Sequence, residues 1–329
     1  MLKVYVLSRS FGKFSEKALK LVESVAKIER NLYGRLSEEE LLEVIKDVDG
    51  IIVGADKIDR KIIEHCRKLK IIAKHGVGID NIDLKAATDN NIVVTSAPHT
   101  NAESVADFTI GLILSVARHI PQAHFSTKHG KWEAPRFIGN EVYGKTIGII
   151  GLGEIGYRVA RRAMGFSMQI LAYDPYISFE KAKETSARVV DLETLLRESD
   201  FVTLHVPLTD ETRGMIGKKE LHLMKKTAYL FNMSRGTVVD ENSLYDALKE
   251  GMIAGAAIDV YSREPPSKDF PLFELDNVVV TPHIAAYTRE AMSRMDETVA
   301  EDIVKFFKGE EPKHIANPEV LKTFRKKAT

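Results

Sequence analysis

The sequence predicts an α/β protein with two doubly wound parallel-sheet (Rossmann-like) domains. Short apolar, β-branched runs alternate with helical patterns along the chain, which is typical of parallel sheets covered by helices. A glycine-rich turn follows one of these runs in the second part of the chain. The length of 329 residues exceeds that of one ordinary domain, so we expect two hydrophobic cores.

The first part of the chain predicts one sheet without a glycine-rich turn. Its strands are expected at residues 4–7, 50–53, 70–73 and 91–95, and its helices at about 15–29, 37–47 and 59–67. Ser37 and Glu40 have the spacing of a capping box at the start of the second helix. Because this part lacks a GxGxxG motif, we do not expect it to hold a dinucleotide.

A long apolar segment at residues 101–118 separates the two parts. It is apolar on most sides, which predicts a deeply buried helix. We interpret it as the crossing between the domains and expect it to contribute to a subunit interface. His119, His124 and His129 follow at irregular spacing, which does not resemble a metal site, so we expect surface histidines and no metal.

Residues 145–175 predict a complete βαβ unit with a phosphate-binding turn. The strand at 146–150 leads directly into three glycines. The first allows a tight turn, the second lets the backbone approach a pyrophosphate, and the third lets the next helix pack on the strand. The turn lies where a helix N-terminus presents free N–H groups to an anion. It consists of Gly151, Leu152, Gly153, Glu154, Ile155 and Gly156.

Asp174 ends the second strand of this unit, 18 residues after Gly156. That is close to the ~20-residue distance at which a strand-end carboxylate meets the adenosine ribose. The alternative is a solvated residue that opens an Asp-Pro turn with Pro175. A carboxylate here repels a 2′-phosphate, and no arginine follows closely to bind one. The sequence therefore favours NAD over NADP.

The composition and the N-terminal pattern limit the cellular location and the classes of partner that we expect for the protein. Lys plus Arg and Asp plus Glu both number 47, so the zero net charge argues against nucleic acid and anionic membranes. The single cysteine, Cys66, excludes an intramolecular disulfide, and the N-terminus has a strand pattern rather than a signal peptide. The longest apolar run, 105–117, is too short to span a membrane. We expect a cytoplasmic protein with a small-molecule partner.

The remaining strands are expected at residues 200–206, 227–232, 253–260 and 277–281, with helices at 241–250 and 289–308. The last helix is amphipathic, and we expect it to return to the first sheet. The predicted domains are therefore 1–99 with 289–329, which binds substrate, and 100–288, which binds NAD. Residues 322–327 predict a basic, frayed tail.

Three polar residues follow predicted strand ends in the second part, where doubly wound sheets bind ligands. Arg235 can hold a carboxylate bidentately and polarise an adjacent carbonyl. His283, paired with Glu264, would suit acid/base work near neutral pH. Each residue alone could have an ordinary structural contact. Together, in the domain with the dinucleotide fingerprint, they predict a catalytic site.

These motifs resemble the NAD-dependent D-2-hydroxyacid dehydrogenases, and most of all the phosphoglycerate dehydrogenase-type members. The similar stretches are 75–83, 117–122, 130–132, 151–156, 232–240, 256–260, 264–266 and 281–284. The resemblance implies a flavodoxin-like substrate domain, an NAD-binding Rossmann domain and a homodimer through the 101–118 helix region. It also implies hydride transfer between the nicotinamide and C2 of a small 2-oxo or 2-hydroxy acid.

The resemblance also implies roles for individual residues. Arg235 would bind the substrate carboxylate and carbonyl oxygen, His283 would be the general acid/base, and Glu264 would orient His283. Asp259 would meet the nicotinamide carboxamide. The other residues of the NAD site would be Gly151, Gly153, Glu154, Ile155, Gly156, Asp174, His205, Val206, Pro207, Met233 and Ser234, with Arg235 and His283. The backbone of Lys74, His75, Gly76, Val77 and Gly78 would hold the substrate carboxylate.

The sequence departs from the phosphoglycerate-specific members at Gly54, where they tend to carry an arginine, although Lys57 lies nearby and Lys74 and His75 could supply positive charge. We also expect no regulatory C-terminal domain. Glyoxylate, hydroxypyruvate and phosphohydroxypyruvate therefore stay open as substrates. A non-enzymatic NADH-sensing protein, like the C-terminal binding protein corepressors, is an alternative. Formate dehydrogenase is disfavoured, because that branch typically has Gln where this chain has Glu264.

Overall fold

The structure is a computed structural model that describes residues 1–30 and 36–322. The chain divides into two compact units, which are Met1–Asn101 with Tyr287–Thr329 (unit 1) and Ala102–Ala286 (unit 2). Each unit contains one sheet whose strands all pair in parallel, so the predicted fold class is confirmed. Of the predicted basic tail, residues 323–327 lie outside the described part.

Unit 1 is built on a five-stranded sheet with strand order β2-β1-β3-β4-β5, the flavodoxin-like order. Its strands are β1 (Lys3–Val6), β2 (Lys27–Arg30), β3 (Gly50–Val53), β4 (Ile71–Lys74) and β5 (Val93–Thr95). Its helices are α1 (Glu16–Glu23), α2 (Glu38–Ile45), α3 (Arg60–His65), α4 (Leu84–Asp89), α12 (Arg289–Phe307) and the 3-10 turn η4 (Pro318–Val320). The predicted capping box of Ser37 and Glu40 is present at the start of α2.

One predicted element of unit 1 is wrong. The helix expected over residues 15–29 ends at Glu23, and Lys27–Arg30 instead form β2, which pairs in parallel with β1. This strand lies at the sheet edge, and Ile28 is its only apolar residue. It therefore lacks the apolar run by which the inner strands were identified.

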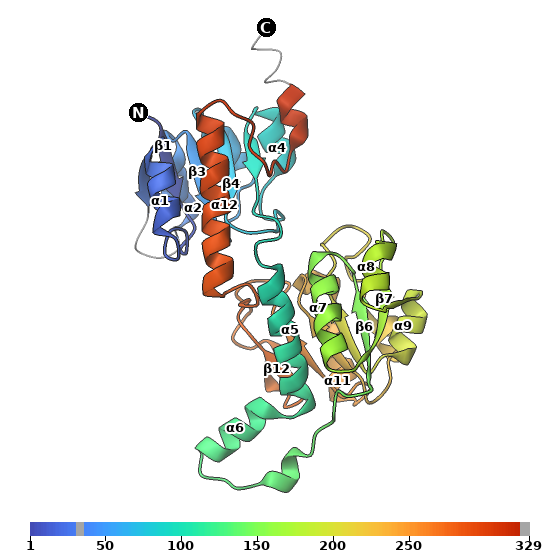
Figure 1. The fold of residues 1–329 in the computed structure, drawn as a ribbon. Coiled ribbons are helices and arrows are strands. Elements are labelled where there is room, and N and C mark those ends of the chain that lie inside the picture. Colours follow the sequence, from blue (N-terminus) through green and yellow to red (C-terminus); the bar gives the residue numbers. More distant parts are fainter. Residues whose placement is uncertain (31–35, 323–329) are drawn as a thin grey trace. The chain divides into compact units, whose positions relative to one another are not determined.

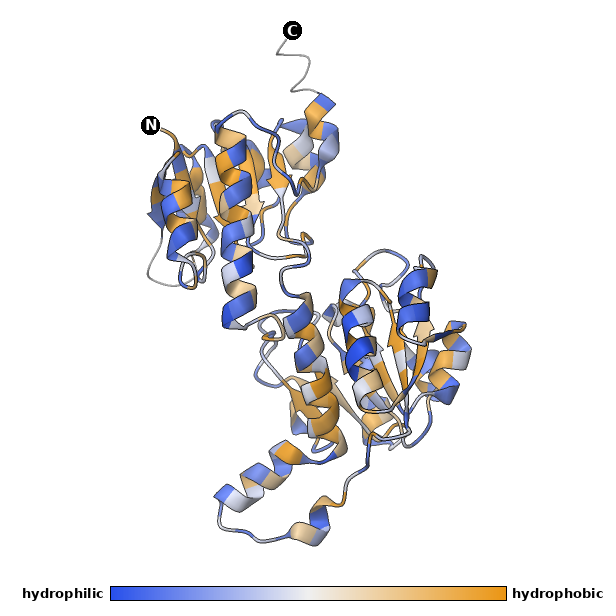
Figure 2. Ribbon diagram, viewed as in Figure 1, coloured by the Kyte–Doolittle hydropathy of each residue, from blue (hydrophilic) through white to orange (hydrophobic). Residues whose placement is uncertain are grey.

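Helix α12 packs on the sheet of unit 1, although it comes last in sequence (Figure 1). Its predicted apolar stripe is buried, and Met295, Val299 and Ile303 share one hydrophobic cluster with Val4 and Ile71. The C-terminal part of the chain thus returns to the first sheet. Figure 2 shows apolar strands inside this layer and hydrophilic residues on the outer faces of the helices.

Unit 2 contains a seven-stranded sheet with order β12-β11-β10-β9-β6-β7-β8, which is the Rossmann order extended by one strand. Its strands are β6 (Thr146–Ile150), β7 (Gln169–Tyr173), β8 (Arg188–Val189), β9 (Phe201–Leu204), β10 (Tyr229–Asn232), β11 (Gly255–Ile258) and β12 (Val278–Val280). Its helices are α5 (Ala102–Ala117), α6 (Ile120–Lys128), α7 (Glu154–Gly165), α8 (Phe179–Glu184), α9 (Leu192–Glu198), α10 (Lys218–Leu223) and α11 (Glu241–Lys249), with the 3-10 turns η1 (Ala134–Phe137), η2 (Gly236–Val238) and η3 (Pro271–Glu274).

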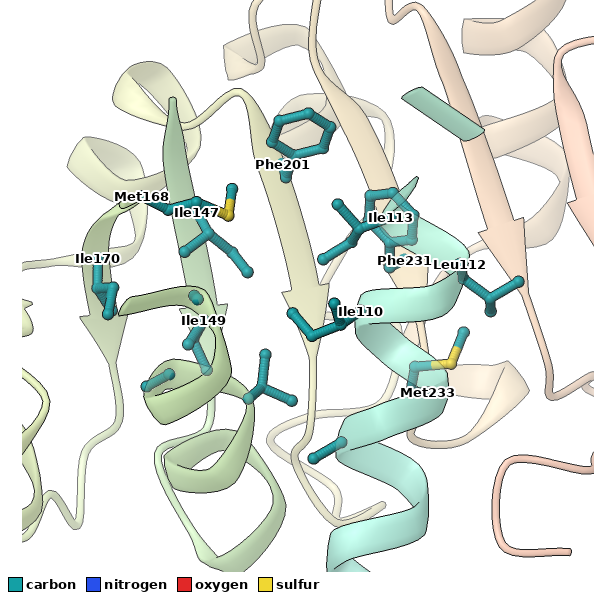
Figure 3. Close-up of a cluster of buried hydrophobic side chains, with 14 of the residues drawn as sticks. Ile110, Leu112, Ile113, Ile147, Ile149, Met168, Ile170, Phe201, Phe231 and Met233 are labelled. Atoms are coloured by element: carbon teal, nitrogen blue, oxygen red, sulfur yellow. The ribbon is translucent and has the colours of Figure 1, made fainter. Parts of the chain in front are cut away.

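The long apolar helix expected at 101–118 is α5, and it is buried against the sheet of unit 2. Ile110 and Ile113 of α5 lie among side chains from the strands, including Ile149 and Phe231 (Figure 3). Burial of each such side chain stabilises the fold by about 1.5–3 kcal/mol. No helix within residues 1–30 and 36–322 is long and apolar enough to cross a membrane.

Candidate active site

The glycine-rich turn between β6 and α7 has the geometry that a dinucleotide requires. Gly151 has a φ of +91°, and a Cβ there would lie 2.9 Å from the backbone of His205. A Cβ on Gly156 would lie 2.0 Å from the carbonyl oxygen of Gly151, so only glycine lets α7 approach β6. Gly153 is exposed at the N-cap of α7, and among the described residues beyond its chain neighbours no atom lies within 4 Å of its Cβ position. The start of α7 is therefore open to a phosphate group.

Asp174 connects the end of β7 to this turn. Its Oδ2 accepts the N–H of Leu152 at 2.9 Å, and its Oδ1 accepts the N–H of Tyr176 at 2.8 Å. The side chain is half-buried, so the reading as a fully solvated residue does not hold, although the bond to Tyr176 does form the Asp-Pro turn. The carboxylate lies beside the turn, where it can also accept ribose hydroxyls.

Glu154 and Ile155 begin α7, and their side chains contact other residues of unit 2. The carboxylate of Glu154 bonds Lys181 at 2.8 Å and Arg158 at 2.7 Å. These two cations outweigh its partial burial and hold its pKa at about 2. Ile155 packs against the hydrophobic cluster of unit 2. The side chain of Glu154 is therefore engaged within the protein, which leaves its backbone as the part suited to a cofactor.

The segment after β9 forms the other wall of the turn. Val206 has a methyl carbon 3.0 Å from the Cβ position of Gly151, and Pro207 follows it. The His205 Nε2 lies 2.9 Å from the hydroxyl of Thr203. Burial lowers the pKa of His205 to about 3, so its imidazole is neutral. Its Nδ1 is buried without a hydrogen-bond partner in the described part of the chain, which fits a site completed by a ligand.

Glu264 and His283 form a hydrogen-bonded pair. The Nδ1 of His283 lies 2.7 Å from Oε2 of Glu264, while Oε1 of Glu264 accepts the N–H of Tyr261 at 3.1 Å. Burial tends to raise the pKa of Glu264, but the bond and charge of His283, the Tyr261 N–H and the charge of Arg235 together lower it. The side chain of His283 is 45% exposed. With Nδ1 on the carboxylate, Nε2 is the nitrogen available to a substrate.

Arg235 stands on a rigid turn after β10. The side chain of Asn232 accepts from the N–H and the hydroxyl of Ser234, both at 3.1 Å, and donates to the carbonyl of Arg235 at 3.0 Å. The guanidinium donates to the carbonyl of Ser234 at 2.8 Å. Met233 and Ser234 are both buried, and Met233 belongs to the hydrophobic cluster below the turn.

The three predicted catalytic residues follow three neighbouring strands. Arg235 comes after β10, Glu264 after β11 and His283 after β12, and these strands are adjacent in the sheet. Because all strands are parallel, their carboxyl ends lie at one edge. The structure therefore places the three residues at one edge of unit 2 and pairs two of them directly.

Asp259 has structural contacts that the sequence did not reveal. Its Oδ1 accepts the hydroxyl of Thr281 at 2.6 Å and the N–H of Ile284 at 2.8 Å, and its Oδ2 accepts the N–H of Ala285 at 2.9 Å. It thereby holds the loop that carries His283, whose φ of +55° is unusual for a residue with a side chain. A backbone of this kind costs about 1–3 kcal/mol and needs such support. The contact of Asp259 with nicotinamide stays a prediction.

In unit 1, the side chains of Lys74 and His75 are buried and engaged inside the unit. The ammonium of Lys74 donates to the carbonyl of Gly54 at 2.6 Å and to the side chain of Asn81 at 2.7 Å. The Nε2 of His75 lies 2.8 Å from Oδ1 of Asp296 in α12, and its Nδ1 lies 3.0 Å from the hydroxyl of Ser8. These contacts fix the start of the loop after β4 and show that Lys74 is not a solvated lysine.

The next three residues of this loop, Gly76, Val77 and Gly78, leave their amides available. Their backbone N–H groups donate to no acceptor within residues 1–30 and 36–322. A Cβ on Gly76 would lie 2.8 Å from Cε of Lys74, so the lysine stem packs under the loop. Consecutive amides without an acceptor, near the side chain of a buried lysine, are groups that can bind an anion.

The described residues contain no cluster of three or more His, Cys, Asp or Glu side chains that could hold a metal. The site thus combines a dinucleotide turn, a strand-end carboxylate and a His–Glu pair beside an arginine. These features define unit 2 as the nucleotide-binding domain of an NAD-linked protein with acid/base groups at the same sheet edge.

Comparison with known proteins agrees with this assignment of unit 2. Residues 110–285 match the family model described as D-isomer specific 2-hydroxyacid dehydrogenase, NAD binding domain. The chain belongs to the D-isomer specific 2-hydroxyacid dehydrogenase family, and its cofactor is NAD.

Relatives with two different names are similar to this chain. A D-3-phosphoglycerate dehydrogenase of Methanocaldococcus jannaschii is 49% identical over 92% of this chain and 57% of its own length. A glyoxylate reductase of Korarchaeum cryptofilum is 47% identical over 87% of this chain and 88% of its own. The chain spans about half the length of the curated phosphoglycerate dehydrogenases that it matches.

Solved structures show the same fold. The TT0316 protein of Thermus thermophilus is 34% identical with a TM-score of 0.87, covering 96% of this chain and 100% of that one. The D-lactate dehydrogenase of Aquifex aeolicus, complexed with NAD and lactic acid, is 29% identical with a TM-score of 0.83, covering 98% of each chain.

Proposed function

We propose that this chain is an NAD-dependent oxidoreductase that interconverts small 2-oxo acids and D-2-hydroxy acids, acting on their CH-OH group. The observation that carries this proposal is the His283–Glu264 pair, which lies at the same sheet edge as Arg235 in an NAD-binding domain. Bound NADH would supply the hydride to C2 of the 2-oxo acid. The chain's own residues bind and polarise the substrate and move the proton.

Arg235 and His283 have different roles at the reacting carbonyl group. The guanidinium of Arg235 binds the substrate carboxylate and polarises the neighbouring carbonyl oxygen, as a rigid bidentate donor can. Protonated His283 donates from Nε2 to that oxygen during reduction and takes the proton back during oxidation. Glu264 accepts from Nδ1, which fixes the orientation of the imidazole ring.

We propose that the amides of Gly76, Val77 and Gly78 in unit 1 also bind the substrate carboxylate. Their free N–H groups and the buried ammonium of Lys74 support this role. Replacing Val77 by proline removes one of these donors, and we expect the KM for the 2-oxo acid to rise. The control is Val189→Ala, in the exposed strand β8 of unit 2.

The contacts of unit 1 favour unphosphorylated substrates. Lys57, the cation nearest to Gly54 in sequence, is exposed and lies 3.5 Å from Asp59. Lys74 is engaged with Gly54 and Asn81. We therefore propose that glyoxylate or hydroxypyruvate is reduced in preference to phosphohydroxypyruvate. The phosphoglycerate dehydrogenase-like activity is the competing assignment, in line with the names of two similar relatives.

The test is NADH oxidation at 340 nm with purified protein and a panel of hydroxypyruvate, phosphohydroxypyruvate, glyoxylate, pyruvate and a branched 2-oxo acid. We expect turnover, highest with an unphosphorylated acid. Preference for phosphohydroxypyruvate would reassign the chain to phosphoglycerate oxidation. Tight NADH binding without turnover of any 2-oxo acid would contradict an enzymatic role and indicate a NADH-sensing protein.

We also propose a homodimer and a cytoplasmic location. The buried residues of α5 pack within unit 2, whereas large apolar side chains are exposed on the adjoining segment 120–143. Phe125, Trp132 and Ile138 are 65%, 89% and 81% exposed. We therefore place the surface for a second copy on this segment, next to the 101–118 region. Sedimentation of the wild type and of a Trp132→Ser, Ile138→Ser variant tests this, with a monomeric wild type as the contrary result.

A further inference from the structure

Tyr261 connects the segments that carry the three proposed catalytic residues. It follows β11, and the residue is 8% exposed. Its backbone N–H donates to Oε1 of Glu264 at 3.1 Å. Its hydroxyl donates to the carbonyl oxygen of Thr281 at 2.8 Å. One residue thus holds both the carboxylate and the loop that carries its histidine partner.

The bond to Thr281 bears directly on His283. The same carbonyl oxygen of Thr281 accepts the backbone N–H of His283 at 3.0 Å. The hydroxyl of Tyr261 and the amide of His283 therefore meet at one acceptor. Asp259 holds other groups of the same loop, namely the Thr281 hydroxyl and the amides of Ile284 and Ala285. The Tyr261 hydroxyl supplies the anchor next to the histidine itself.

The segment that carries Arg235 also lies against Tyr261. A Cβ on Gly236 would lie 1.9 Å from the carbonyl carbon of Tyr261 and 2.1 Å from the nitrogen of Ser262. Only glycine allows this approach, so the turn that follows Arg235 rests on the backbone of Tyr261. A shift of Tyr261 would therefore displace the segments that carry Arg235, Glu264 and His283.

The tyrosine ring is itself well fixed. It packs edge-on against Phe270 and Phe273, with ring centroids 5.7 and 6.3 Å away. Burial, with the charges of Asp259 and Glu264, raises the pKa of Tyr261 to about 12. The hydroxyl therefore remains protonated and remains a donor throughout the working range of an enzyme.

We propose that Tyr261 is a positioning residue, whose hydroxyl places the loop 281–285 so that Nδ1 of His283 meets Glu264. The effect that we expect on kcat rests on the proposed oxidoreductase function. The effect that we expect on the His283–Glu264 hydrogen bond does not depend on any substrate.

The kinetic test compares Tyr261→Phe with Tyr245→Phe. Both variants remove one hydroxyl from unit 2. Among the described residues, the hydroxyl of Tyr245 in α11 forms hydrogen bonds with the side chains of Glu274 and Lys249 and with no others. Loss of one hydrogen bond behind the acid/base group predicts a fall in kcat of about threefold to tenfold for Tyr261→Phe. We expect the KM for NADH, and all parameters of Tyr245→Phe, to stay near the wild-type values. Equal kcat values in the two variants would overturn the proposal.

The spectroscopic test follows the imidazole N–H of His283 by NMR in protein labelled with ¹⁵N-histidine. The resonance is assigned as the one lost in His283→Gln. In Tyr261→Phe we expect this signal to shift or to broaden by exchange with solvent, while Tyr245→Phe leaves it in place. An unchanged signal refutes the positioning role. If the wild type turns over no 2-oxo acid, the proposed function fails, and this measurement still decides the role of Tyr261.

Discussion

The imidazole of His283 and the carboxylate of Glu264 lie 2.7 Å apart, although they are 19 positions apart in sequence and each follows a different strand. The backbone of His283 is in the left-handed region, at a φ of +55°. Asp259 and Tyr261 stabilise this conformation from two sides. The pair is therefore a product of the loop geometry as well as of the two side chains.

Replacing His283 by alanine should lower kcat by about 10²-fold or more, because the imidazole that transfers the proton is removed. Binding of NADH, measured by fluorescence titration, should change little. His222→Ala is a suitable control, since His222 lies in α10 and its imidazole bonds the carbonyl of Lys218 within the same helix. A rate near that of the wild type would remove His283 from the proposed chemistry.

Replacing Asp174 by alanine should relax the preference for NADH over NADPH, because the carboxylate that repels a 2′-phosphate is removed. The ratio of kcat/KM for the two cofactors is the measurement. Asp191→Ala removes a carboxylate that caps α9 in the same unit, and it should leave the ratio unchanged. An unaltered ratio in Asp174→Ala would mean that this carboxylate does not read the ribose.

Gly156→Ala should destabilise the protein by about 1–3 kcal/mol, because the added carbon would lie 2.0 Å from the carbonyl oxygen of Gly151. It should also weaken NADH binding, since the phosphate turn must move. Gly165→Ala, at the other end of α7, adds the same carbon where no described atom outside the neighbouring backbone of α7 lies within 4 Å. There the change should be neutral or stabilising by up to about 1 kcal/mol. Equal free energies of unfolding for the two variants, measured by denaturant unfolding, would contradict this prediction.

Glu154 should make the stability of the protein depend on pH at the acidic end. Its pKa is about 2 in the folded protein and 4.5 as the reference value. The folded state therefore holds fewer protons, so the contribution of Glu154 is present above about pH 4.5 and is lost as the pH falls toward 2. Glu154→Gln should flatten the unfolding free energy over this interval relative to the wild type. Parallel curves for the two proteins would show that its ion pairs with Lys181 and Arg158 contribute nothing.

The sequence was sufficient to predict a strand, a turn or the position of a residue wherever one strong local pattern marks that feature. The inner strands, the turn at Gly151–Gly156 and the positions of Arg235, Glu264 and His283 after adjacent strands all follow from apolar runs and the residues next to them. The edge strand β2 has no such run and was missed. The bonds of Asp259 to the loop of His283, and of His75 to Asp296, join residues 22–26 and 221 positions apart. Spacing along the chain carries no signal for contacts of that kind.

The late position of α12 bears on the order in which the protein forms during translation. The face of the unit 1 sheet that includes Val4 and Ile71 is covered by a helix that begins at Arg289. All of Ala102–Ala286 must be synthesised in between, which takes roughly 10–40 s at the usual rate of elongation. Unit 2 is continuous and can fold as soon as it leaves the ribosome. The N-terminal part of unit 1 therefore keeps some of this apolar face uncovered until α12 has been synthesised, and this is the interval in which a chaperone would matter.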